Sequence, residues 1–226
     1  MKQNARSKKP LTPFNGQLSP QGVANGINAA IKNAGRLLAD AELLARSGRY
    51  ASACAMAVLS IEESGKPSVL RRLAIAKDDA AAKALWRDYR NHRAKNAAWI
   101  IVDLARRGAR TLRDLAPIYD PESDHPAILD AIKQCGFYTD SYASDSWSIP
   151  EEVIDEELST QILLAAKILL SDKTVTTREI ELWIEHVGAD LSKAGLHGYF
   201  RAIQAEGFSA PEDNDVLERF LGIKEH

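Results

Sequence analysis

One stretch of the chain is apolar on every side of a helix, and it limits the folds open to the sequence. Residues 50–61 read Tyr-Ala-Ser-Ala-Cys-Ala-Met-Ala-Val-Leu-Ser-Ile, with no charged side chain before Glu62. A helix of this kind has no face to turn towards water, so it must lie at the centre of its domain. Its many small residues let neighbouring elements approach closely. The stretch therefore predicts a buried core helix.

The composition indicates that its neighbours are also helices. Hydrophobic residues make up 45% of the 226 residues and aromatic residues only 7%. Alanine and leucine dominate while valine and threonine are sparse, which favours helix over sheet. Apolar residues recur three and four apart over 19–46, where Ser19 and Pro20 form a helix start and Gly48 follows the end. We therefore predict an all-α fold, an up-down antiparallel helical bundle.

The remaining elements are predicted from their start and stop signals. The buried helix is expected to break or kink at Gly65 and Pro67. A third long helix, capped by Asp78 or Asp79, should run to about Arg107. The other predictions are a short helix over 124–136, an ordered aromatic loop over 136–150 held by Tyr138, Tyr142 and Trp147, a helix capped by Ser148 that runs through Ala166, and helices over 177–187, 191–205 and 214–220.

We expect one helical domain with two appendages. Residues 1–18 carry Lys2, Arg6, Lys8 and Lys9 without an acidic residue and predict a flexible basic tail. Residues 19–172 form the bundle, and residues 173–226 form a C-terminal helical extension packed on the same domain. A capping box, Thr176 with Glu179, begins this extension's first helix.

The net charge of −2 conceals a strong asymmetry. Residues 69–113 contain twelve Lys/Arg and four Asp/Glu, whereas residues 145–226 contain seven Lys/Arg and seventeen Asp/Glu. A basic middle suits a polyanion, and an acidic C-terminal third suits shielding of that middle or a basic partner. The alternative interpretation is a dipolar protein whose two halves only keep it in solution.

The basic segment contains the strongest candidate for chemistry. Residues 85–96 read Leu-Trp-Arg-Asp-Tyr-Arg-Asn-His-Arg-Ala-Lys-Asn, which surrounds one histidine with cations and two aromatic rings. On a continuous helix, Leu85, Tyr89 and His92 share one stripe, and Lys95 lies near it. Arg87 and His92 form an R-x4-H motif. A histidine in such a stripe is either a buried polar group with a partner or a reactive group.

Two carboxylates near the end of the buried helix form a second candidate group. Glu62 and Glu63 stand where the helix dipole disfavours anions, so they are either solvated or held by cations. Lys66 is placed to pair with Glu62 at i, i+4, and the basic segment just downstream offers further cations. No phosphate-cradling glycine loop accompanies them, which makes a nucleotide site the least favoured alternative.

Several stretches together resemble the AbiV family of bacterial abortive-infection proteins, within the HEPN superfamily of helical nucleic-acid-associated domains. The resemblance spans roughly residues 25–170 and rests on the order and spacing of its pieces. These pieces are Asn33–Leu44, Gly48–Ala53, Glu62–Lys66, Tyr89–Lys95 and Gly136–Asp140, with Trp147 and Pro150.

The resemblance implies an antiphage role and, by superfamily analogy, a metal-independent endoribonuclease or RNA-binding toxin that shuts down translation on infection. The superfamily motif R-x4-6-H maps onto Arg87 and His92 as catalytic residues, in a site completed across a homodimer. On a straight helix these two side chains lie about 140° apart, whereas His92 and Lys95 converge better, so either pair remains open. The supporting or RNA-binding residues are then Arg90, Asn91, Lys95, Glu62, Glu63, Lys66 and Tyr89.

The expected partners are RNA, a second copy of the chain and a phage-encoded activator protein. We expect no cofactor and no metal site, because no Cys/His cluster has ligand spacing. The absence of a long apolar run and of a signal peptide predicts a cytoplasmic protein that does not enter a membrane, and two cysteines fit reduced thiols there. The alternative function is a non-catalytic helical module that binds a phage or host protein, in which His92 and Glu62 belong to a structural polar network.

Overall fold

A pair of long antiparallel helices forms the centre of the fold. The computed structural model describes residues 12–91, 124–141, 145–188 and 191–210. In this structure α1 spans Pro20–Arg46 and α2 spans Tyr50–Ala74. The Ser19 side chain caps α1, as predicted. Gly48 reverses the chain with a φ of 72°, a conformation that glycine adopts without steric cost.

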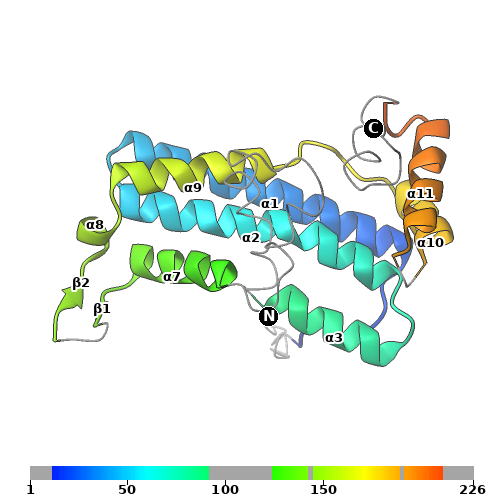
Figure 1. The fold of residues 1–226 in the computed structure, drawn as a ribbon, viewed down its shortest axis with the longest axis horizontal. Coiled ribbons are helices and arrows are strands. Elements are labelled where there is room, and N and C mark those ends of the chain that lie inside the picture. Colours follow the sequence, from blue (N-terminus) through cyan, green and yellow to red (C-terminus); the bar gives the residue numbers. More distant parts are fainter. Residues whose placement is uncertain (1–11, 92–123, 142–144, 189–190, 211–226) are drawn as a thin grey trace, which may run out of the picture.

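Helix α2 is covered on several sides, as its sequence predicts. It packs against α1, against α9 (Glu156–Leu169), against α7 (His125–Phe137) and against α3 (Asp79–Arg90). Figure 1 shows α7 and α3 arranged end to end on one side of α2, with α1 and α9 on the other. Residues that are fully enclosed in α2 include Ala53, Cys54, Ala55, Ala57 and Val58. The all-α fold is thus confirmed.

Different elements lie at the two ends of this bundle. At one end are α10 (Thr177–Val187) and α11 (Lys193–Ala205), and α10 packs on α1. At the other end lie a hairpin of β1 (Asp140–Ser141) and β2 (Trp147–Ser148), and the short helix α8 (Pro150–Val153) (Figure 1). The predicted capping box of Thr176 and Glu179 is present. No helix among the described residues is long and apolar enough to cross a membrane.

Of the break or kink predicted at Gly65 and Pro67, the break does not occur. Helix α2 continues through Pro67 to Ala74. A proline inside a helix removes one backbone hydrogen bond, yet the following turns are almost fully buried through Val69, Leu70 and Leu73. Tertiary burial of this apolar face outweighs the local cost of the proline.

The third helix is much shorter than predicted. Asp78 caps α3 through its side chain, but the helix ends at Arg90 instead of continuing to about Arg107. Asn91 is extended, with φ −82° and ψ 124°. Asparagine is a poor helix former, and Arg87 and Arg90 repel each other at i, i+3, so both disfavour continuation. The rest of the predicted helix, residues 92–107, lies outside the described residues.

The aromatic loop and the helix after it also differ from prediction. Tyr138 and Trp147 are 61% and 68% exposed, so burial of these rings does not hold the loop, and Tyr142 lies outside the described residues. Ser148 belongs to the hairpin, where its hydroxyl donates to the Asp140 carbonyl at 3.1 Å, and it caps no helix. The predicted single helix is two, α8 and α9, because the chain is interrupted at Ile154 and Asp155 caps α9.

The ends of the chain complete the comparison. Of the tail predicted over residues 1–18, the described part begins at Thr12, and Phe14–Gly16 contact α3 through hydrogen bonds and ring packing. Helix α11 lies within the predicted range 191–205, with Ser192 as its N-cap. The helix predicted over 214–220 lies outside the described residues.

The close crossing of α7 and α2 gives a stability prediction. A Cβ added at Gly136 would lie 2.8 Å from the Ala51 carbonyl oxygen and 3.0 Å from the Ala55 Cβ. We expect Gly136→Ala to lower the free energy of unfolding by about 1–3 kcal/mol, because helix backbones must separate. Chemical denaturation followed by circular dichroism measures this.

Gly35→Ala is the matched control. Its added Cβ would meet only the Leu170 Cδ2, at 4.0 Å, which is ordinary contact. Alanine is also the better helix former, so this variant should be unchanged or stabilised by up to about 1 kcal/mol. Equal effects of the two substitutions would contradict the close crossing.

Candidate functional site

Three of the predicted supporting residues meet where α2 faces α3. The Lys66 Nζ lies 2.5 Å from the Glu63 Oε1 and 5.1 Å from the centroid of the Tyr89 ring. Tyr89 also packs edge-on against Trp86 at 5.2 Å between ring centroids. The carboxylate, the ammonium group and the ring therefore form a link between the two helices. Lys66 pairs with Glu63 rather than with Glu62, which corrects the predicted i, i+4 pair.

Glu62 points towards a different helix and is buried at 3% exposure. Neighbouring residues on a helix differ in direction by about 100°, and Glu62 and Glu63 pair with different lysines. The Lys133 Nζ, from α7, lies 2.7 Å from the Glu62 Oε1 and 2.8 Å from Asp130 Oδ1. A cation from outside the basic segment thus holds Glu62, although the sequence pointed to residues 69–113.

This buried ion pair ties α7 to α2. Burial by itself lowers the pKa of Lys133, but hydrogen bonds to Asp130 and Glu62 raise it above the ordinary value. A lysine that stays charged and paired on both sides is not a free base for catalysis. The only local signal for this partner was the i, i+3 spacing of Asp130 and Lys133 on a predicted helix. We assign Glu62 a structural role.

Arg90 fixes the N-terminal segment against the end of α3. Its guanidinium donates to the Phe14 carbonyl and to Asn15 Oδ1, and lies over the Trp86 ring at 5.1 Å from the centroid. The Trp86 Nε1 donates to the Gly16 carbonyl at 2.8 Å. Sequence reasoning placed Arg90 beside the histidine and missed both Trp86 and the segment it holds. The contacts with this segment join residues 70 to 76 positions apart, which a local pattern does not reveal.

Arg87 and Asn91 lie exposed at the C-terminal turn of α3. None of the described residues forms an ion pair or hydrogen bond with the Arg87 side chain. His92 and Lys95 lie outside the described residues, so the choice between the pairs Arg87–His92 and His92–Lys95 stays open. Because Asn91 is extended, the 140° separation expected for a straight helix does not apply to Arg87 and His92.

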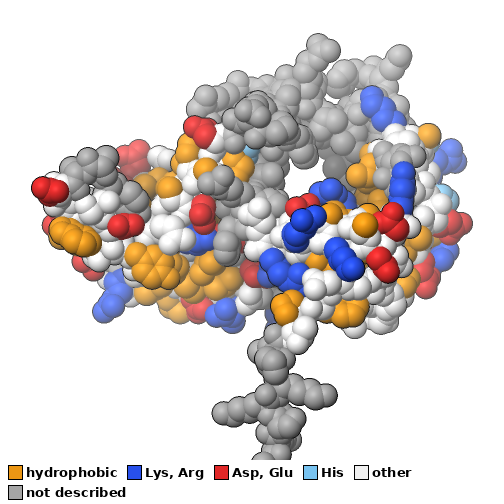
Figure 2. Space-filling view, turned by 90° about the horizontal axis from the view of Figure 1, so that it is seen from below, with side chains coloured by type: hydrophobic (Ala, Val, Ile, Leu, Met, Phe, Trp, Pro, Cys, Tyr) orange, Lys and Arg blue, Asp and Glu red, His pale blue; other side chains and the backbone are white. Residues whose placement is uncertain are grey.

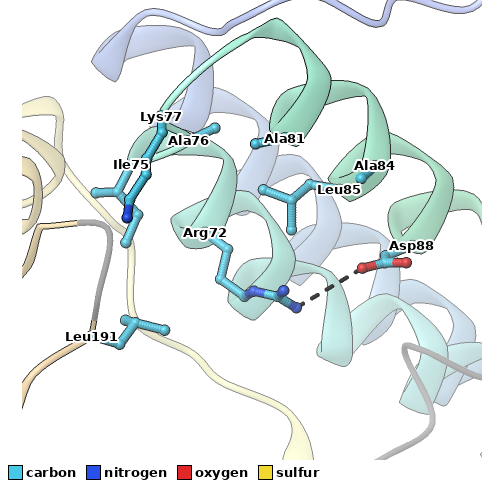
Figure 3. Close-up of a pocket in the computed structure, with 9 residues that line it drawn as sticks. All are labelled: Arg72, Ile75, Ala76, Lys77, Ala81, Ala84, Leu85, Asp88 and Leu191. Atoms are coloured by element: carbon cyan, nitrogen blue, oxygen red, sulfur yellow. Dashed lines mark ion pairs between the residues drawn. The ribbon is translucent and has the colours of Figure 1, made fainter.

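A pocket of about 290 Å³ lies nearby, where the end of α2 meets the start of α3. Figure 3 shows its apolar wall, formed by Ile75, Leu85 and Leu191 with several alanines, and the charged groups at its rim. Arg72 Nη1 lies 4.0 Å from the Asp88 carboxylate, across the two helices. The pocket shares no residue with the group of Glu63, Lys66 and Tyr89. Its size is just below the usual range of small-molecule sites, about 300–1,000 Å³.

Other reactive groups in the described part are not arranged for catalysis. Both cysteines are free thiols, and burial raises the pKa of Cys54 to about 12, which keeps it protonated and inert. Within the residues that the structure describes, no three His, Cys, Asp or Glu side chains are grouped to hold a metal ion.

Comparison with known proteins identifies the family. The sequence model of AbiV, within the HEPN group, matches residues 22–171, about two thirds of the chain. The chain belongs to the AbiV family. No curated protein and no solved structure matches it. The AbiV match links the chain to HEPN-type defence proteins that act by abortive infection.

The AbiV match covers the central part of the fold. It includes α1, α2 and α3, the pair of Glu62 and Lys133, and the hairpin between α7 and α8. Residues 12–16, which Arg90 holds, precede it, and α10 and α11 follow it. The contacts of Arg90 therefore join a residue inside the match to a segment that precedes it.

The ion pair between Glu62 and Lys133 gives a second prediction. Replacing Lys133 with methionine removes a cation that pairs with a buried carboxylate, so the free energy of unfolding should fall by about 3–5 kcal/mol near neutral pH. The folded-state pKa of Lys133 lies above its unfolded value. Its contribution is therefore complete below the unfolded pKa and is lost as the pH rises through the folded pKa.

The difference between the wild type and Lys133→Met should thus be constant at neutral pH and shrink in alkaline solution. Urea titrations at several pH values measure it. Lys167→Met provides the control, because Lys167 pairs with Glu42 on the surface with 54% of its side chain exposed, and should cost at most about 1 kcal/mol. If Lys133→Met proves as stable as this control, the result contradicts a structural role for Glu62.

Proposed function

We propose that this protein is an abortive-infection effector that binds RNA at the C-terminal end of α3 and cleaves it without a metal ion. The RNA would be single-stranded, where the ribose 2′-hydroxyl is accessible. Loss of RNA would then stop translation in the infected cell.

The observation that carries this proposal is the exposed basic surface of α3 and the adjoining end of α2. Its members are Arg72, Lys77, Lys83, Arg87 and Arg90. Figure 2 displays more Lys and Arg side chains over this half of the molecule than over the other, with acidic side chains among them. Cations of this kind supply the sequence-independent attraction for a phosphate backbone.

The proposed chemistry requires a base and a group that stabilises negative charge. His92 would act as general base or acid as the 2′-oxygen attacks the neighbouring phosphorus. Arg87, which no described side chain neutralises, would stabilise the anionic transition state, with Lys95 as the alternative cation. The extended Asn91 turns the backbone just before His92, so the two motif residues need not follow the geometry of one straight helix.

Lys66 and Tyr89 support the same end of α3 from α2. The cation over the ring, at 5.1 Å, and its ion pair with Glu63 fix the turn that carries Arg87. In this arrangement Tyr89 and Lys66 are positioning residues for the proposed site. Glu62, which is buried and pairs with Lys133 of α7, supports the core in this proposal.

The nuclease proposal predicts cleavage of total RNA by the purified protein in the presence of a metal chelator. His92→Ala should slow cleavage about 10²-fold or more, because a general acid–base group is removed. Arg36→Ala is the matched control and should cleave like the wild type, since Arg36 is an exposed cation on α1 that pairs only locally with Asp40. Gel analysis of the products measures the rate.

Phage plating on cells that express each variant tests the cellular role. The wild type and Arg36→Ala should reduce plating, and His92→Ala should restore it. No cleavage by any variant, together with protection that survives His92→Ala, would contradict the nuclease and favour a non-catalytic module.

RNA binding is tested separately by its dependence on salt. For single strands the slope of log K against log salt is about −0.7 per phosphate contact, so Arg87→Ala should reduce its magnitude by about 0.7. Arg36→Ala should leave the slope unchanged. Fluorescence anisotropy with a labelled single-stranded RNA provides the binding constants. Identical slopes for the wild type and both variants would mean that the RNA does not bind at Arg87.

A further inference from the structure

The end of the molecule opposite α10 and α11 exposes a group of large apolar side chains. They come from the end of α7, the hairpin and α8, and are between 39% and 68% exposed. We call this the hairpin surface, and its members are Phe137, Tyr138, Trp147, Ile149 and Val153. Aromatic side chains gain most from burial, so several of them exposed together mark an interaction site.

The hairpin surface stands on a well-anchored base. Asp140 pairs with Ser148 and Ser141 with Trp147 in the antiparallel hairpin. Gly136, just before Phe137, is packed against the α2 backbone, and Ile154, just after Val153, is 3% exposed. Residues at both edges are therefore fixed in the core while the rings between them face outwards. Such an arrangement costs little ordering entropy when a partner binds.

The chain segment that carries these rings has charged residues of one sign. Between Gln134 and Ala166 the chain contains seven Asp/Glu and no Lys/Arg. All the acidic residues of this stretch are exposed: Asp140, Asp145, Glu151, Glu152, Asp155, Glu156 and Glu157. Figure 2 shows hydrophobic and acidic side chains together at this end, with some Lys and Arg side chains at its edge. The acidic excess of this segment disfavours nucleic acid and anionic lipid and favours a cationic partner.

A second copy of the chain is a poor occupant for the same reason. A two-fold dimer through this surface would bring the acidic stretch of one copy against the same stretch of the other, which is unfavourable. A contact with the basic α3 of another copy would be head-to-tail and would propagate unless it closed into a ring.

We propose that the hairpin surface docks a different protein, through a segment rich in Lys and Arg with interspersed aliphatic side chains. The aliphatic groups cover Phe137, Ile149 and Val153. The cations lie over the rings of Tyr138 and Trp147, where cation–π attraction adds to that of the carboxylates. This interaction is independent of the proposed RNA site, so either can fail without the other.

The test uses a labelled synthetic peptide of alternating arginine and leucine, titrated with the full-length protein at near-physiological salt. Trp147→Ala and Glu152→Lys should each weaken binding about tenfold, through loss of the ring and reversal of the charge. Their controls are Leu43→Ala and Glu185→Lys, an exposed leucine on α1 and an exposed glutamate on α10, which should bind like the wild type. A peptide with glutamate in place of arginine should not bind.

Two outcomes would overturn the proposal. In the first, the peptide binds all variants equally, or it does not bind the wild type at all. The other is a dimer of the wild type, seen by light scattering, that Trp147→Ala converts to monomer, because the occupant would then be a second copy. The melting temperature of each variant is measured as a control. A value near that of the wild type shows that unfolding does not explain either result.

Discussion

The fold depends on enclosing a helix that has no face for water. Helix α2 is built largely from small and apolar residues up to Ile61, and it can be stable only with neighbours on every side. Among the described helices, α1 and α9 cover it on one side and α7 and α3 on the other. The alanines of α2 allow these helices to approach it closely. At Gly136 of α7 the approach is so close that there is no room for a methyl group.

The polar groups of α2 divide the layer formed by α7 and α3 into two parts with different roles. Glu62 is turned to α7, where Lys133 and Asp130 close a buried ion pair. Glu63, one residue later, is turned through Lys66 towards Tyr89 of α3. One carboxylate thus fastens the core, and the other supports the helix end that carries Arg87. The separation of basic and acidic surfaces follows the same division, with cations over α3 and acids beyond α7.

The sequence predicted what depends on local pattern and missed what depends on distant contacts. The α1 cap at Ser19, the central burial of α2, and the capping box at Thr176 follow from residues close in sequence. The passage of α2 through Pro67 depends on the tertiary burial of the turns that follow it. The end of α3 at Arg90 was missed because no glycine or proline marks it. Of the site, the group of Glu63, Lys66 and Tyr89 was predicted as supporting residues, whereas Lys133 and Trp86 were not, since their partners lie far along the chain.

The hold of Arg90 and Trp86 on residues Phe14–Gly16 has a consequence for handling the protein. Residues Phe14–Gly16 are anchored beside the end of α3, so any peptide fused ahead of Met1 would be tethered to that helix end through residues 1–13. A purification tag placed there would raise the local concentration of its own charges around α3. Tags at the two termini are therefore not equivalent for this chain, and comparing proteins purified with each is a simple safeguard for any activity measurement.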